Sequence, residues 1–183
     1  MISRTVFSGF GGQGVLLMGY ILSHGAMRKG LDVTYFPAYG AEMRGGTANC
    51  TVIISDTKIS SPIVTRFDVV VALNQPSLDK FEKAVKPGGI LLYDSTTIIH
   101  PPTRTDITIV PVPASEEAVK LKNSKTMNMI VLGAVLEQTN VVTMESVLQA
   151  LKKVLPERYH HLLPLNEQAL RRGMQLAAEP QPA

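Results

Sequence analysis

The sequence predicts an α/β protein with a doubly wound, mostly parallel, Rossmann-like sheet and a helical C-terminal extension. A strand pattern, a helical pattern and a second strand pattern follow one another between Arg4 and Pro37, as in a βαβ unit. Later strand patterns are almost continuously apolar, which is typical of a sheet covered on both faces. The final third of the chain is helical in pattern. We see no repeat and no linker, so residues 1–183 are expected to form a single domain.

The first part of the chain alternates regular elements with glycine-rich connections. Residues 4–8 predict a strand, and residues 15–29 predict a helix from their apolar spacing. Residues 31–37 are rich in β-branched and aromatic side chains and predict a second strand, stopped by Pro37. Residues 38–50 have no clear period, so we expect a loop there.

The remainder of the chain continues the strands and then becomes helical. Apolar runs predict strands over 49–56, 68–73 and 87–95, and a last strand that ends before Pro111. A helix is predicted over 76–85, with Pro76 at its first position. Further helices are predicted over 114–122, 128–138, 143–155 and 157–178, and the end of the last one is expected to fray into a tail over 176–183.

Composition narrows the class of protein. Hydrophobic residues make up 45% and charged residues 18% of the 183 residues, as in a globular domain. The net charge of +3 comes from scattered basic residues, Trp is absent and aromatics are 5%, so we do not expect nucleic-acid binding. No apolar run reaches the roughly 18 residues of a membrane span, and no secretion signal is evident. We therefore expect a soluble cytoplasmic protein.

The lone Cys50 limits the metal and redox chemistry of the chain. One cysteine excludes a disulfide within the chain and makes a cysteine-ligated cluster or zinc site in it untenable. Cys50 lies in an apolar strand pattern, so we expect a small core residue there. No metal site is predicted.

The stretch "GFGGQG" follows the first strand and opens the first helix. Gly9, Gly11 and Gly14 fit the spacing G-x-G-x-x-G, which allows a phosphate or carboxylate to approach the amino end of a helix. NAD binding also needs an acidic residue at the end of the second strand, whereas Asp32 stands at its beginning. A Walker P-loop needs Lys and Ser or Thr where Gln13-Gly14-Val15 stands. The alternative is a tight turn that binds nothing.

A second glycine-rich loop follows the second strand. Loops at the carboxyl ends of parallel strands share one edge of the sheet, so we expect both loops on one ligand-facing edge. Arg44 could present a fork of hydrogen-bond donors to a carboxylate or a phosphate. The alternative is a surface ion pair between Arg44 and Glu42. The candidate residues of this loop are Tyr39, Glu42, Arg44, Gly45 and Gly46.

Taken together, the two loops resemble the gamma component of the 2-oxoacid:ferredoxin (or flavodoxin) oxidoreductases. The resemblance extends over nearly the whole chain, through "FDVVVALNQPSLDKF", "KPGGILLYDS" and "NEQALRRG". Ala41 stands where many relatives have proline. The segment "RGGTAN" is most similar to the 2-oxoglutarate branch, with the branched-chain 2-oxoacid branch second. The matching positions are Gly9, Gly11, Gly12, Gln13, Gly14, Tyr39, Gly40, Glu42, Arg44, Gly45, Gly46, Ser55 and Asp56.

The resemblance implies an activity that this chain performs only with other subunits. Such complexes convert a 2-oxoacid and CoA to acyl-CoA and CO2, with thiamine diphosphate, Mg2+ and iron–sulfur clusters, and pass electrons to ferredoxin or flavodoxin. The chain would pack on alpha and beta, and in some complexes delta, subunits. It would offer its two glycine-rich loops to CoA or to those partners, without a catalytic residue of its own. Asn128 and Asn166 match family positions and are expected to make structural polar contacts.

Two other classes of protein also fit these sequence features. A stand-alone NAD(P)-linked reductase would use the glycine loop as a dinucleotide site. A purely structural interaction protein would pack both loops against a partner and bind no ligand.

Overall fold

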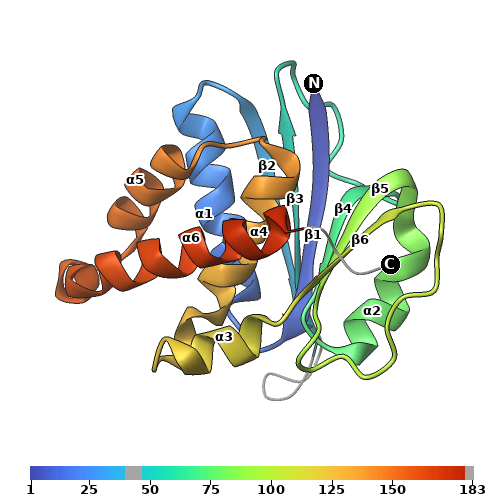
Figure 1. Ribbon diagram of the computed structural model, residues 1–183. Coiled ribbons are helices and arrows are strands. Elements are labelled where there is room, and N and C mark those ends of the chain that lie inside the picture. Colours follow the sequence, from blue (N-terminus) through green and yellow to red (C-terminus); the bar gives the residue numbers. More distant parts are fainter. Residues whose placement is uncertain (40–46, 180–183) are drawn as a thin grey trace.

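The computed structural model describes residues 1–39 and 47–179, and its centre is a six-stranded sheet (Figure 1). The sheet order is β2-β3-β1-β4-β5-β6. Strand β3 runs antiparallel to β1 and β2, whereas the pairs β1–β4, β4–β5 and β5–β6 are parallel. The predicted mostly parallel α/β fold is therefore confirmed. The strands are β1 (Ile2–Phe10), β2 (Asp32–Tyr39), β3 (Thr47–Ser55), β4 (Phe67–Ala72), β5 (Val85–Asp94) and β6 (Thr108–Val112).

The first βαβ unit differs from a simple one because β3 lies between its two strands. β1 and β2 run in the same direction, but each pairs with β3 rather than with the other. Both ends of the loop expected over 38–50 belong to strands, since β2 continues to Tyr39 and β3 begins at Thr47. The predicted bounds of the loop were wrong at both ends, because residues 38–39 and 47–50 pair across the sheet; residues 40–46 lie outside the described residues.

Two prolines that were expected to stop strands lie inside them. Pro37 pairs in register with Cys50, and Pro111 pairs with Tyr93. Pro37 is in β2 and Pro111 is in β6, the two edge strands of the sheet. In an edge strand, the N–H that proline lacks can face away from the neighbouring strand, so no acceptor there loses its hydrogen bond. Whether a proline can lie inside a strand depends on whether that strand is at the edge of the sheet, and the local sequence does not show this.

Helices cover the two faces of the sheet unequally (Figure 1). Five of the helices gather on one face, and α2 lies on the other. The C-terminal helical extension is confirmed. The start of the expected tail is wrong, because Leu176 and Ala177 are buried in the last helix. The helices are α1 (Val15–Arg28), α2 (Gln75–Phe81), α3 (Ala114–Lys120), α4 (Met127–Thr139), α5 (Met144–Val154) and α6 (Leu163–Ala178).

The core divides in the same way as the helices. The larger cluster lies between the sheet and the five-helix face and includes Phe7, Met18 and Ile130. The smaller one surrounds α2 and includes Val70 and Leu78. Helix α4 is buried on nearly all sides, which explains why its sequence is apolar all round rather than amphipathic.

Helices α4 and α6 pack unusually closely because glycines face each other's backbone. A Cβ added at Gly133 would overlap the carbonyl oxygen of Leu170, and one at Gly173 would overlap that of Ile130. No side chain fits between the two helices at this crossing. The crossing fixes the C-terminal helix onto the buried α4.

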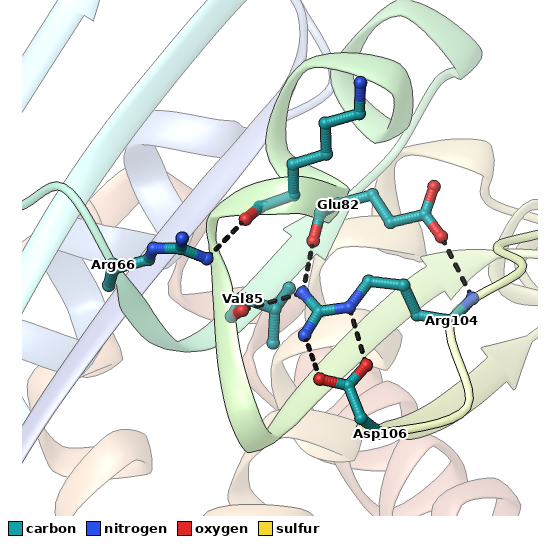
Figure 2. Close-up of polar contacts among 6 residues, drawn as sticks. Arg66, Glu82, Val85, Arg104 and Asp106 are labelled. Atoms are coloured by element: carbon teal, nitrogen blue, oxygen red, sulfur yellow. Dashed lines mark hydrogen bonds and ion pairs between the residues drawn. The ribbon is translucent and has the colours of Figure 1, made fainter.

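A cluster of polar contacts around Arg104, here called the Arg104 clamp, lies at the amino end of β5 (Figure 2). The glycine loop is at the other end of the strands. The guanidinium of Arg104 donates to the backbone oxygens of Glu82 and Val85, at 3.0 and 2.7 Å, and pairs with the Asp106 carboxylate. Arg66 donates to the carbonyl oxygen of Lys83 at 2.8 Å. The clamp holds the short 3-10 helix Glu82–Ala84 at the amino end of β5.

Within residues 1–39 and 47–179, no helix combines the length and the apolar character that a membrane span requires.

Candidate functional site

The glycine loop lies at the carboxyl end of β1 and is closed by one side chain. The Phe10 N–H donates to Oε1 of Gln13 at 2.6 Å, and the Gln13 N–H donates to the Phe10 carbonyl at 3.2 Å. Gly12 and Gly14 have φ of +93° and +78°, so both positions favour glycine. The loop is therefore a tight turn closed by hydrogen bonds between Phe10 and Gln13.

Gln13 also ties the loop to the neighbouring strand β4. Its Nε2 donates to the carbonyl oxygen of Leu73, just beyond β4, at 3.4 Å. A Cβ added at Gly9 would meet Gln13 Oε1 and the Leu73 side chain. Gly9 therefore makes room for the Gln13 side chain, whose amide oxygen accepts from Phe10 in the loop and whose amide nitrogen donates to Leu73. The exposed backbone of Gly11 and Gly12 remains as the outer surface of the turn.

The loop leads into the amino end of α1, which has no side-chain cap. Gly14 is the N-cap residue, and the first turn carries no acidic residue. The Met18 N–H is the first to find an acceptor within the helix, at the Gly14 carbonyl, 3.0 Å away. The amides of Val15, Leu16 and Leu17 precede it, at the positive end of the helix dipole. This geometry suits an anion.

Two asparagines that the motif does not contain lie at the same edge. Asn128, in the first turn of α4, is 8% exposed and packs so tightly on Gly14 that a Cβ there would overlap its Nδ2. Asn74 caps α2 and follows Leu73 directly, and its Nδ2 is buried without a partner among the described residues. Sequence reasoning missed Asn74 and treated Asn128 as structural, because their position depends on how β4 and α4 pack.

The second glycine-rich loop begins at the same edge. Gly9 of β1 and Tyr39 of β2 pair with the same β3 residue, Ala48, so the three lie in one row across the sheet. Tyr39 is thus at the same edge of the sheet as the start of the glycine loop, with β3 between them. Four of the expected residues, and the Arg44–Glu42 ion pair, fall outside the described residues: Glu42, Arg44, Gly45 and Gly46.

The acidic residue that NAD binding would require is absent from the described end of β2. Asp32 lies at the amino end of the strand, where its carboxylate accepts a hydrogen bond from the Ile59 N–H at 2.7 Å. Its carboxylate therefore lies at the other end of β2 from the glycine loop. This position does not fit a ribose-binding acid.

Cys50 is a core residue, as the sequence predicted. It is fully buried beneath α1, where a Cβ added at Gly19 would overlap its sulfur. Burial raises the pKa of the Cys50 thiol to about 12, which opposes the thiolate that metals and electrophiles require. Among residues 1–39 and 47–179, no group of three His, Cys, Asp or Glu side chains could hold a metal ion. Neither an iron–sulfur cluster nor a thiamine-bound Mg2+ fits the described residues of this chain.

A groove of about 490 Å³ between α3 and α6 is lined in part by the buried Glu117 and by Arg172. Glu117 accepts from Nε of Arg172 at 2.6 Å and from Nζ of Lys120 at 2.7 Å. The Arg172 hydrogen bond, followed by that of Lys120, lowers the pKa of Glu117 despite its burial. Glu167 and Arg171 pair on the same wall, so the charges of the groove satisfy one another.

The geometry defines a class: a Rossmann-like α/β chain that presents a glycine loop and an uncapped helix at the carboxyl edge of its sheet. The model of the pyruvate ferredoxin/flavodoxin oxidoreductase family matches residues 4–176, so the chain belongs to that family.

Individual relatives and a solved structure agree with this family. The chain is 46% identical over 133 residues to ketoisovalerate oxidoreductase subunit VorA of Methanothermobacter thermautotrophicus, covering 73% of this chain and 28% of VorA. It is 35% identical over 156 residues to 2-oxoglutarate synthase subunit KorC of Methanocaldococcus jannaschii, covering 82% of each. The chain therefore spans less than a third of VorA but most of KorC.

The fold is also found in 2-oxoglutarate:ferredoxin oxidoreductase from Magnetococcus marinus, solved with 2-oxoglutarate, coenzyme A and succinyl-CoA bound. The TM-score is 0.87 at 27% identity, over 100% of this chain and 32% of that chain.

Proposed function

We propose that this chain is the gamma subunit of a thiamine-diphosphate-dependent 2-oxoacid oxidoreductase. The complex would decarboxylate a 2-oxoacid, transfer the acyl group to the CoA thiol, release CO2 and pass two electrons to ferredoxin or flavodoxin. The family match over residues 4–176 is the observation that carries this proposal.

The proposed substrate is 2-oxoglutarate. KorC supports it, because the similarity covers 82% of both chains, and so does the Magnetococcus structure. A branched-chain 2-oxoacid is the second candidate, since VorA is 46% identical over the region that it shares with this chain.

The partners proposed are the alpha and beta subunits, with delta as a further subunit in some complexes. They would carry thiamine diphosphate, Mg2+ and the iron–sulfur clusters, because the described residues of this chain do not fit these groups. The complex is proposed to be cytoplasmic.

The proposed role of this chain is assembly and the CoA-facing side of the complex. The paired loops at the carboxyl edge would form that side, and the uncapped start of α1 supports an anionic ligand there. The residues concerned are Gly9, Gly11, Gly12, Gln13, Gly14, Tyr39, Glu42, Arg44, Gly45 and Gly46.

Anaerobic purification of the native chain tests the proposal. Partner subunits should co-purify, and the complex should form acyl-CoA faster with 2-oxoglutarate than with pyruvate or 2-ketoisovalerate. A faster reaction with 2-ketoisovalerate would favour the second candidate. Recovery of the chain alone, with no CoA-dependent turnover, would contradict the subunit assignment.

The variant Arg44→Ala tests the second loop in the same complex. We expect a higher KM for CoA. An unchanged KM and kcat would remove Arg44 from the CoA-facing side.

A further inference from the structure

We propose that Asn128, together with the amino end of α1, forms a subsite for a phosphate group of CoA. The inference rests on the proposed function for the identity of the ligand. The subsite itself rests on the contact between Asn128 and Gly14, on the burial of Asn128 and on the uncapped helix.

The Asn128 side chain carries an amide that the described residues leave without a hydrogen bond. It is 8% exposed, yet its side chain has no hydrogen bond with any of the described residues. Among the described residues, Asn74 Nδ2 is the one side-chain N or O atom that is fully buried without a partner, so the amide of Asn128 still reaches the surface and is open to a ligand. Two other asparagines of the helical layer do make side-chain hydrogen bonds: Asn166 donates to the Leu162 carbonyl at 3.0 Å, and the Asn123 side chain accepts from the Lys125 N–H.

Gly14 brings the Asn128 amide to the start of α1. A Cβ at Gly14 would overlap Nδ2 of Asn128 and would lie 2.9 Å from its Cβ and Cγ. Glycine at this position therefore has two roles, because it also adopts a φ of +78° as the N-cap. Any other residue would push the Asn128 amide away from the helix terminus.

The donors around this point match a phosphate oxygen. The Val15, Leu16 and Leu17 amides precede the first intrahelical hydrogen bond, and Asn128 Nδ2 adds a side-chain donor beside them. Neither α1 nor α4 has an acidic residue in its first turn, so neither of these two turns sets a carboxylate against an anion. Helix termini and neutral donors bind phosphate in this way without requiring a lysine.

The test measures CoA affinity in the purified complex carrying Asn128→Ala, Asn128→Ser or Asn128→Asp. We expect Kd to rise about tenfold for the alanine variant and more for the aspartate variant, because a carboxylate repels phosphate at this distance. Asn128→Ser keeps a small donor, should fall between wild type and alanine, and supplies the answer if the alanine variant does not assemble. The control is Gln149→Ala, an exposed amide that bonds Arg28 at the other end of α1 and should leave Kd unchanged.

Ligand fragments identify the group that Asn128 contacts. If the contact is to the 3′-phosphate, Asn128→Ala should weaken CoA and leave 3′-dephospho-CoA unaffected. If it is to the diphosphate, both should weaken, and inorganic phosphate should compete with CoA less well in the variant. If Asn128→Ala weakened the binding of pantetheine as much as that of CoA, Asn128 would contact an amide of the pantetheine arm. That result would overturn the phosphate subsite. Wild-type affinity in all three variants would overturn the role of Asn128, whereas a wild-type complex that does not bind CoA would overturn the proposed function itself.

Discussion

Glu117 shows how one residue couples the fold to pH. The residue is 5% exposed, and its carboxylate pairs with Arg172 and Lys120. The Arg172 hydrogen bond lowers the pKa of Glu117 below its ordinary value. A carboxyl whose pKa is lowered in the folded state stabilises the fold above its ordinary pKa, and this stability is lost as the pH falls through the lowered value.

Glu117→Gln should therefore lower the free energy of unfolding at pH 7 by about 1–3 kcal/mol, since it removes a charged acceptor from Arg172. The difference from wild type should shrink below the ordinary pKa of a glutamate. Urea unfolding across this pH range provides the measurement. The control is Glu167→Gln, an exposed pair with Arg171 worth at most about 1 kcal/mol. Equal losses in both variants would mean that burial of Glu117 contributes nothing.

The candidate site was predicted from sequence only where its residues are consecutive. The spacing of Gly9, Gly11 and Gly14 and the start of α1 follow from local sequence, and the structure confirms both elements. The contacts of Gln13 with Leu73 and of Gly14 with Asn128 join segments that are distant in sequence. No local pattern distinguishes Asn128, whose place beside Gly14, without a hydrogen bond to any described residue, follows from the packing of α4.

At the scale of elements, the α4–α6 crossing depends on two glycines that pack against backbone. Gly173→Ala should destabilise the chain by about 1–3 kcal/mol, because the new Cβ can be accommodated only if the helices separate. Thermal or urea unfolding provides the measurement. Gln175→Ala, on the exposed side of α6, should change stability by less than about 0.5 kcal/mol. A Gly173→Ala protein as stable as wild type would show that α6 shifts freely on α4.

The elements themselves were largely predictable, because apolar periodicity marks strands and helices well. Their order in the sheet was not. The insertion of β3 between β1 and β2, and the tolerance of Pro37 and Pro111, depend on which strands lie at the edges. Edge position follows from long-range pairing, so a rule that prolines end strands fails in both places.

At the scale of the whole molecule, the amino ends and the carboxyl ends of the parallel strands have different roles. The amino edge carries the Arg104 clamp, and the carboxyl edge carries the glycine loop and the start of α1 (Figures 1 and 2). Hydrogen bonding to Asp106 raises the pKa of Arg104 and lowers that of Asp106, so the pair stays charged at neutral pH.

Arg104→Ala should lower the Tm of the chain and leave the KM for CoA of the complex unchanged, because the clamp holds backbone at the edge away from the ligand. A thermal melt and a CoA titration of the reconstituted complex provide the measurement. Lys58→Ala, on the exposed loop after β3, is the control and should change neither quantity. A selective rise in the KM for CoA would show that the two edges are coupled.

Hydrogen exchange of the intact complex, with and without CoA, is the most direct measurement of the central claim that the carboxyl edge of this chain faces CoA. We expect CoA to slow exchange in residues 9–17 and at the start of α4, and to leave the Arg104 clamp and the far end of α1 unchanged. Unchanged exchange throughout residues 9–17 and α4, at CoA concentrations that saturate turnover, would contradict the claim and leave this chain as a subunit for assembly alone.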